Sequence, residues 1–232
     1  MLNFKLSSAV FSASVAALAL TSSANAASIT IGNHSFESPI APLQPSGEYY
    51  SDNSIGSWVV SSPVSGGAGV FNPESSQVNT GTSYFNSSLP DGSQVAYNNA
   101  GSIFQALTSN LTTNTNYLLS VFVGRRNDAP FPGYNVELLA GNNVLAFNNS
   151  VIPGLGEFAE VLVQYTSGSS NPFLGQPLGI RLSSLGGQTN FDNVTLTATS
   201  TAVPTPALLP GLIGLGIAAL RKRKAEKVKV EV

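Results

Sequence analysis

Apolar and polar residues alternate with a period of two through most of the middle of this 232-residue chain. These short runs are rich in β-branched and aromatic residues, and clusters of Gly, Asn, Ser and Pro separate them, which is the pattern of strands joined by turns. No segment of residues 27–202 has a convincing apolar stripe of helical period, so helical crossovers between parallel strands are not expected. The sequence therefore predicts an all-β fold, an antiparallel β-sandwich.

The pattern places the strands in eleven segments: 28–31, 58–61, 69–71, 94–97, 102–106, 117–124, 134–140, 144–147, 158–165, 178–182 and 191–197. In segment 117–124 both alternating sets of residues are largely apolar, so we expect a central strand that is covered on both faces. The stretches 61–67, 75–88 and 167–171 are rich in Ser, Thr, Asn and Gly and are predicted to be loops.

The first 26 residues have the layout of a secretory signal peptide. Lys5 is their only charge, residues 9–20 are an apolar run, and Ala24, Asn25 and Ala26 form a small-residue end. A membrane anchor is the alternative, but the run is too short to cross about 30 Å of hydrocarbon at about 1.5 Å per residue. We therefore expect cleavage before Ala27 and export of one domain, residues 27–202.

The charge of this domain limits its partners. It contains ten acidic residues and only three basic ones, Arg125, Arg126 and Arg181, and therefore carries a formal charge of −7. Such a surface argues against nucleic acid and favours neutral ligands or cations. The chain has no cysteine and a single histidine, His34, so neither disulfides nor a zinc site are expected.

Residues 203–232 form a three-part tail: a Pro-rich motif, a short apolar segment and a basic end. The motif is Val203, Pro204, Thr205 and Pro206, and the basic end is Arg221, Lys222, Arg223 and Lys224. A basic end stays on the cytoplasmic side, which leaves the domain beyond the membrane. The apolar helix expected at 211–220 is only about 15 Å long, which is thin for a permanent span.

This tail resembles the PEP-CTERM sorting signal of Gram-negative and cyanobacterial envelopes, with Thr205 where the family motif most often has glutamate. The resemblance implies transient anchoring in the inner membrane by the C-terminal helix and processing by an exosortase-type protease. It also implies a final location in the cell envelope or outside the cell, in association with polysaccharide or the cell surface. A simple short transmembrane anchor is the alternative.

Three motifs mark the ends of the domain: residues 33–37 (NHSFE), 55–58 (IGSW) and 191–196 (FDNVTL). In this order they resemble the galactose-binding-like jelly rolls of many carbohydrate-binding modules, which implies a jelly roll, glycan binding and a structural calcium held by Glu37 and Asp192. First and last strands of a sandwich often pair, and paired carboxylates suit calcium. The alternative is a solvated Glu37 and a turn-capping Asp192.

One further segment is typical of a ligand site. Two arginines and an acid end the longest predicted strand, and aromatic residues beside prolines follow, which suits the hydroxyls and rings of a neutral saccharide. The predicted ligand-binding residues are Arg125, Arg126, Asp128, Phe131 and Tyr134, and the other candidates for stacking on a sugar are Tyr49, Tyr50, Tyr84 and Phe85. A surface Arg–Asp pair is the alternative. Trp58 is expected in the core.

No catalytic motif is visible along the chain. It has no nucleophile elbow, no phosphate loop and no histidine cluster, and the sequence places no two acids as a hydrolytic pair. We therefore expect no catalytic residues and a non-catalytic, exported, surface-sorted protein that binds or organises extracellular polysaccharide. The alternative is a structural or adhesive protein of the envelope matrix without a sugar pocket.

Overall fold

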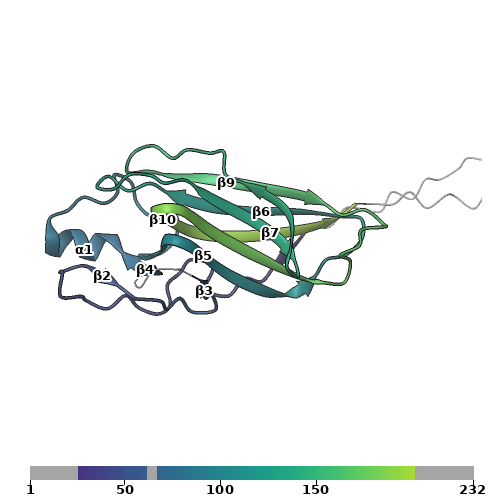
Figure 1. Cartoon of the computed structure of the whole chain (residues 1–232), viewed down its shortest axis with the longest axis horizontal. Helices are drawn as coiled ribbons and strands as arrows, with labels where there is room; N and C mark the ends of the chain where they lie inside the picture. The colour runs from purple at the N-terminus through teal and green to yellow at the C-terminus, as the bar shows by residue number, and fades with distance from the viewer. Residues whose placement is uncertain (1–25, 62–66, 202–232) are drawn as a thin grey trace, which may run out of the picture. The chain divides into compact units, whose positions relative to one another are not determined.

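The computed structural model describes residues 26–61 and 67–201, which form ten strands and one helix (Figure 1). The elements are β1 Ala26–Ile29, β2 Tyr49–Tyr50, β3 Val59–Ser61, β4 Ala68–Asn72, α1 Pro73–Thr80, β5 Val95–Asn110, β6 Thr115–Gly124, β7 Tyr134–Ala140, β8 Asn143–Asn148, β9 Phe158–Thr166 and β10 Pro177–Ser200. All strand pairings are antiparallel, so the all-β prediction is confirmed. Residues 1–25 of the predicted signal peptide (1–26) and the tail motifs at 203–206 and 221–224 lie outside the described residues.

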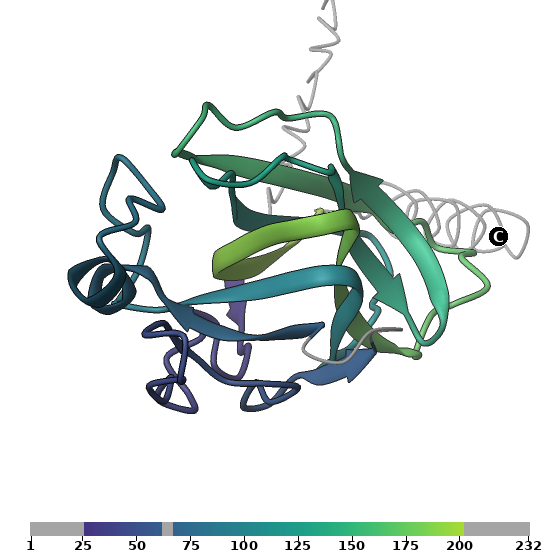
Figure 2. The same ribbon diagram turned by 60° about the vertical axis from the view of Figure 1, so that its left-hand side comes forward.

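Strands β5 and β10 pair with each other along most of their length and take part in both layers of the sandwich. The first part of β10 pairs with β5 and β7, and the second part pairs with β5, β6 and β1. Between the two parts, residues 185–187 of β10 lie opposite the single residue Ala100 of β5. Such a bulge increases the local twist and bends the strands, as Figure 2 shows.

This bend corrects the sequence prediction of separate strands at 94–97 and 102–106, and again at 178–182 and 191–197. Each pair of segments belongs to one continuous strand, β5 or β10. Gly, Asn and Ser residues between the segments are typical of a loop, but here they form the bulge. Ala100 and Gly101 take positive φ angles of 58° and 112°, which turn the chain without ending its strand pairing.

Strand β6 lies between β10 and β9, which is the central position expected for segment 117–124. Its inward residues Tyr117, Leu119, Val121 and Val123 are at most 1% exposed and belong to the main core. The opposite face is less covered than predicted, since Leu118 is 38% exposed. Burial of the inward set supplies the main driving force for the sandwich.

Helix α1 corrects the loop prediction for the first part of segment 75–88. The Asn72 side chain accepts a hydrogen bond from the Ser75 N–H at 2.9 Å, and Pro73 occupies the first turn. Gly81 ends the helix at φ 74°, and its N–H donates to the Gln77 carbonyl at 2.8 Å. Capping residues, and not an apolar stripe, therefore define this helix.

In the described part of the chain, no helix is long and apolar enough to cross a membrane.

Candidate functional site

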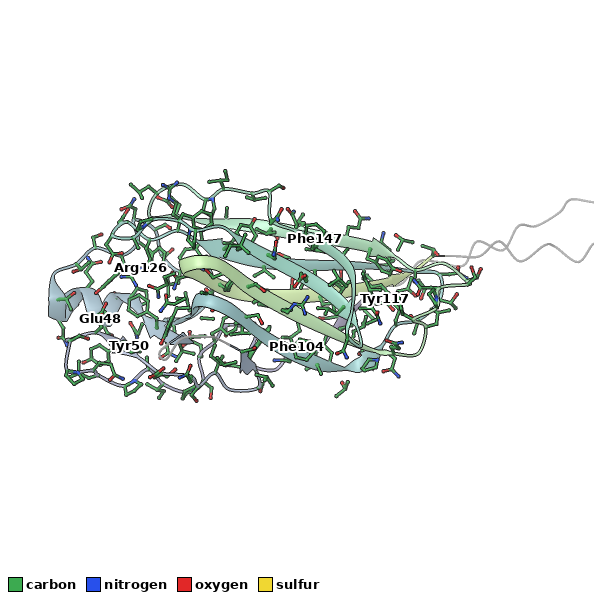
Figure 3. The ribbon with its side chains drawn as sticks, in the orientation of Figure 1. Glu48, Tyr50, Phe104, Tyr117, Arg126 and Phe147 are labelled. Carbon is green, nitrogen blue, oxygen red and sulfur yellow. The ribbon has the colours of Figure 1, made fainter. Side chains whose placement is uncertain are left out.

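A pocket of about 210 Å³ opens where β2, β4, β5 and β10 lie side by side. Its lining residues come from these strands, from the loops on either side of β2 and from the segment after β6: Glu48, Tyr50, Asp52, Phe71, Tyr97, Asn99, Arg126 and Gln188. Register explains the gathering, because directly paired residues point to the same face of a sheet: Tyr50 pairs with Phe71, and Asn99 pairs with Gln188. Figure 3 shows Glu48, Tyr50 and Arg126 at one end of the sandwich, far from Tyr117.

Aromatic rings form one wall of this pocket. The Tyr50 and Tyr97 rings meet edge to face, with centroids 6.1 Å apart and an angle of 89° between their planes. Tyr97 is buried, and its hydroxyl donates to the Ser51 carbonyl at 2.9 Å. Burial, followed by the nearby charge of Asp52 and by Tyr50 and Glu48, raises the pKa of Tyr97. The phenol therefore stays protonated and neutral across the physiological range.

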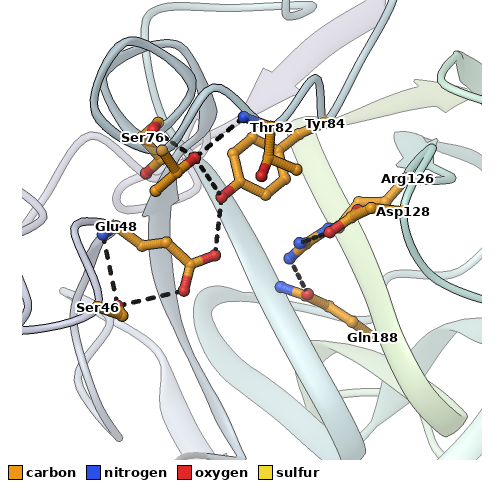
Figure 4. A network of polar contacts seen from close by, with 9 residues as sticks. Ser46, Glu48, Ser76, Thr82, Tyr84, Arg126, Asp128 and Gln188 are labelled. Carbon is orange, nitrogen blue, oxygen red and sulfur yellow. Dashed lines mark hydrogen bonds and ion pairs between the residues drawn. The ribbon is translucent and has the colours of Figure 1, made fainter.

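Arg126 is held rigidly beside that wall (Figure 4). Its Nε and Nη2 donate to the two carboxylate oxygens of Asp128 at 2.8 and 2.5 Å. Its guanidinium carbon lies 5.2 Å from the Phe71 ring centroid and 4.6 Å from that of Tyr84, within cation–π range. Burial raises the pKa of Asp128, but the hydrogen bonds and charge of Arg126 outweigh it and hold this pKa below its ordinary value.

Arg126 also orients Gln188. Its Nη1 donates to the Gln188 side-chain oxygen. A guanidinium has only donors, so the oxygen of this amide must face it and the NH₂ group must face away. Figure 4 shows the contact of Arg126 with the side-chain oxygen of Gln188. The amide NH₂ group of Gln188 therefore supplies two N–H donors at the lining of the pocket.

Glu48 is the carboxylate with a defined position in the pocket. Its Oε1 accepts a hydrogen bond from the Tyr84 hydroxyl at 2.9 Å, and its Oε2 accepts one from Ser46 Oγ at 3.4 Å. The Tyr84 hydroxyl also lies 3.3 Å from Thr80 Oγ1. These contacts are drawn in Figure 4. Asp52, the second carboxylate of the pocket, is exposed. A positioned carboxylate at an aromatic wall is suited to proton transfer.

A second hollow of about 570 Å³ lies along α1 and the loop after it, lined by Pro73, Glu74, Val78, Phe85 and Leu89 among others. This hollow is larger than the first, but Glu74 is the single ionisable side chain among its lining residues. Ligand sites combine an apolar wall with a few convergent polar groups. The pocket of Glu48 and Arg126 meets that description, so we take it as the candidate functional site.

The structure separates the five predicted ligand residues. Arg126 lines the pocket and Asp128 pairs with it, whereas Arg125 is not among the lining residues and its Nε is buried without a partner in the described part. Tyr134 is 1% exposed, donates to the Val151 carbonyl at 2.9 Å and packs on Phe131 at 6.1 Å. Its ring is therefore a core ring rather than a platform for a ligand.

The sequence analysis identifies some residues of this pocket and misses others. Tyr50 is among the predicted stacking residues, and it does line the pocket. Glu48, Tyr97, Asn99 and Gln188 carry no local motif: the register of β5 with β10 brings the last three together, and Glu48 lies in the loop before β2. Trp58 is 6% exposed and packs 5.3 Å from the Phe36 ring, so it lies in the core as expected.

Glu37 and Asp192 contact the same loop, residues 91–94. They lie near each other because the first strand, β1, pairs with the last, β10. Glu37 Oε1 accepts from the N–H groups of Ser93 and Gln94, both at 2.8 Å. Asp192 accepts from the N–H of Asp91 at 3.0 Å and from that of Asn193 at 2.7 Å. Both carboxylates thus tie the chain ends to loop 91–94.

The surroundings of Asp192 are suited to a cation but do not define a metal site. Burial, together with the charges of Asp91 and Glu37, raises the pKa of Asp192 to about 8, against the opposing effect of its two backbone hydrogen bonds. No basic side chain pairs with it in the described part of the chain. Within the same residues, no group of three or more His, Cys, Asp or Glu side chains could hold a metal. Calcium at Glu37 and Asp192 stays a prediction.

Comparison with known proteins gives one family and a set of solved structures. The model of the HpiC1-like family, described as HpiC1 cyclase, matches residues 27–197. The Stig cyclase Fisc from Fischerella sp. TAU, in complex with (3Z)-3-(1-methyl-2-pyrrolidinylidene)-3H-indole, is 30% identical. The match covers 77% of this chain and 100% of that one, with a TM-score of 0.67. No curated protein sequence matches this chain.

Two further cyclase structures are similar. An apo form from Fischerella sp. is 28% identical over 77% of this chain and 98% of that one, with a TM-score of 0.66. A cyclase from Fischerella sp. TAU in complex with 4-(1H-indol-3-yl)butan-2-one is 29% identical over 76% and 100%, with a TM-score of 0.65. A structure described as CBM4 also matches, at 16% identity over 73% of this chain and 99% of that one, with a TM-score of only 0.42.

Proposed function

The chain belongs to the HpiC1-like family, and from this premise we propose that it is a cyclase whose active site is the pocket of Glu48, Tyr50 and Arg126. The family match spans residues 27–197, almost the whole described domain. The pocket combines an aromatic wall with a positioned carboxylate, and this combination is the observation that carries the proposal.

The same premise corrects two expectations from the sequence. The protein was expected to be no enzyme, and to bind or organise extracellular polysaccharide; both expectations are wrong. A family described as a cyclase matches the domain, and a 30% identical cyclase matches over 77% of the chain. The error has a physical cause: the pocket residues come from separate strands and loops, so no linear motif announces them.

The proposed substrate has a flat aromatic ring system with an unsaturated side chain. Two of the similar cyclase structures hold compounds that contain an indole or indole-derived ring. The pocket of this chain suits such a ring, because the Tyr50 ring is half-buried and lies edge-on to Tyr97. The Gln188 amide NH₂ would bind an acceptor atom of the substrate and so fix its orientation.

A ring closure of this kind moves a proton and passes through positive charge on carbon. Glu48 is the group that we assign to proton transfer, since Tyr84 and Ser46 hold its two oxygens in place. The faces of Tyr50 and Tyr97 would stabilise the positive charge as it develops. Positioned acid–base groups contribute on the order of 10²–10⁴ to a rate.

The test uses an indole with an alkenyl side chain and looks for a product of unchanged mass but altered chromatographic retention. We expect Glu48→Gln to lower turnover by about 10² or more. Binding of 4-(1H-indol-3-yl)butan-2-one, measured by titration calorimetry, should change only a few-fold. Glu157→Gln, outside the pocket, is the matched control. Full turnover in the Glu48→Gln variant would refute the role of Glu48 in proton transfer. If this variant kept both full turnover and unchanged binding, the pocket would be refuted as the active site.

We also propose that the protein is exported, cleaved before Ala27, and processed near Pro204 by an exosortase-type protease after transient anchoring in the inner membrane. The layout of residues 1–26 and 203–232 supports this proposal. Mass spectrometry of the mature chain from its host tests it. A mature protein that still carries residues 1–26 or 221–232 would contradict the corresponding step.

We propose, finally, that Glu37 and Asp192 bind a structural calcium ion. The burial of Asp192 near two other carboxylates supports this assignment, because a divalent cation would offset their mutual repulsion. Such an ion would tie the end of the sandwich to loop 91–94. Thermal melts with calcium and with chelator test it, as described in the Discussion.

A further inference from the structure

We infer that the pocket selects an organic cation: an aromatic substrate with a positive charge on the group attached to its ring system. This inference rests on the proposed function and adds the charge class of the substrate. It follows from three features of the pocket, namely its charge, its aromatic wall and the position of its carboxylate.

The first feature is an excess of negative charge. Glu48 and Asp52 both line the pocket, and Arg126 is the only basic residue among the lining side chains. Arg126 is paired through two hydrogen bonds with Asp128 and is 10% exposed, so its charge is compensated before a ligand enters. The pocket region therefore has two uncompensated carboxylates facing a ligand.

Apart from Arg126, no basic side chain of the described residues lines the pocket. Arg181 pairs with Glu137 on β7, in the other part of the sandwich. Arg125 is not among the lining side chains. Charges at a pocket with low-dielectric walls act more strongly than in open water, so the two carboxylates favour a cation and disfavour an anion.

The second feature is the group of aromatic rings at and beside the pocket, which already binds a flat cation of the chain itself. The Arg126 guanidinium lies over the rings of Phe71 and Tyr84 at 5.2 and 4.6 Å. Tyr50 and Tyr97 continue the wall beyond this guanidinium. A second cation can bind against these rings because an aromatic face attracts positive charge.

The third feature is the fixed position of the Glu48 carboxylate. Tyr84 lowers the mobility of Glu48 through the hydrogen bond to Oε1, and Ser46 contacts Oε2. The negative charge is thus fixed at the edge of the wall rather than on a free side chain. A ring packed on Tyr50 would place an attached ammonium or iminium group within reach of Glu48 and Asp52.

The experiment compares three indoles that share a ring and differ in charge: tryptamine, which is a cation at pH 7, neutral 3-(2-hydroxyethyl)indole, and the anion indole-3-propionate. Dissociation constants are measured by titration calorimetry with the full domain. We expect tryptamine to bind about 10-fold more tightly than the neutral compound, and the anion to bind more weakly still. The preference should shrink in 1 M salt, where charges are screened within about 3 Å.

Variants assign the preference to its residues. Asp52→Asn and Glu48→Gln should each lower tryptamine affinity about 3-fold while leaving the neutral compound unchanged, and the double variant should abolish the preference. Glu74→Gln is the matched control, because Glu74 lines the other hollow. This control should bind all three compounds like the native protein.

The outcomes separate this inference from the proposed function. Equal binding of tryptamine and the neutral indole would overturn the charge selection while leaving the cyclase pocket in place. A preference that survives in the double variant would also overturn it, because another group would then be the source. Failure of all three indoles and of 4-(1H-indol-3-yl)butan-2-one to bind would overturn the proposed function itself.

Discussion

Replacing Asp192 by asparagine should destabilise the protein at acidic pH and stabilise it at alkaline pH. Asp192 is 0% exposed, and burial, together with nearby acids, raises its folded-state pKa from 3.8 to about 8. A group whose folded pKa lies above its unfolded pKa destabilises the fold when it ionises. In the presence of chelator, the native protein should therefore lose stability as the pH rises from about 4 to about 8, and this loss should be absent below pH 4.

The size of the effect follows from the shift. A change of roughly four pKa units, at 1.36 kcal/mol per unit, corresponds to about 6 kcal/mol between the two ends of that range. The amide introduced by Asp192→Asn would not ionise. The Asp91 N–H now bonds to Oδ2 of Asp192 and the Asn193 N–H to Oδ1, and the amide replaces one of these oxygens by an NH₂ group that cannot accept. One unpaired donor costs about 1–3 kcal/mol. The variant should therefore be less stable than the native protein at pH 4 and more stable at pH 9.

Thermal melts followed by circular dichroism between pH 4 and pH 9, with chelator present, measure this crossing. A difference of about 3 kcal/mol at pH 9 corresponds to roughly 6–12 °C for a domain of this size. Added calcium at pH 8 should raise the midpoint of the native protein and leave Asp192→Asn unchanged if Asp192 is a ligand. Two melting curves that stay parallel across the whole pH range would refute the reasoning.

Two other changes should also have measurable effects. Arg126→Lys keeps the charge but loses the two-point contact with Asp128. A double-mutant cycle with Asp128→Asn in urea should give a coupling of about 1–2 kcal/mol at neutral pH. Because the folded pKa of Asp128 is lowered, this coupling should vanish as the pH falls through that pKa; a coupling that persists in acid would contradict the assignment. Gly92→Ala should destabilise by about 1–3 kcal/mol, because φ is +69° and the added Cβ would lie 2.2 Å from Glu37 Oε1; an unchanged urea midpoint would contradict it.

Much of the fold could be predicted because its determinants are local. The inward residues of β6 recur at every second position, and that period alone predicts a half-buried strand. The strand predicted at 134–140 has the bounds of β7, since turn residues flank it on both sides. Helix α1 was missed although Asn72, Pro73 and Gly81 are its capping residues, because its exposed faces lack an apolar stripe. The bends of β5 and β10 were missed because a bulge and a loop have the same composition.

The candidate site was much harder to predict than the fold. The segment after β6 drew attention to Arg126 and Asp128, because their charges are rare in this chain. The same reasoning included Phe131 and Tyr134, which pack together near the core. Neighbours along a loop need not face one pocket, since each side chain follows the local backbone. Sequence proximity therefore identified the lining residue Arg126 and its partner Asp128, and not the rest of the site.

By itself, the sequence determined an antiparallel sandwich and an acidic domain without disulfides, because period, charge and composition are properties of the chain read in order. Only the tertiary structure decided that Glu48, Tyr97, Arg126 and Gln188 share a pocket. These residues lie up to 140 positions apart. The register of β5 with β10 sets Tyr97 and Gln188 in place, and the loop before β2 and the segment after β6 add Glu48 and Arg126. A shift of one residue in that register would turn Asn99 and Gln188 to opposite faces, which is why strand pairing creates the site.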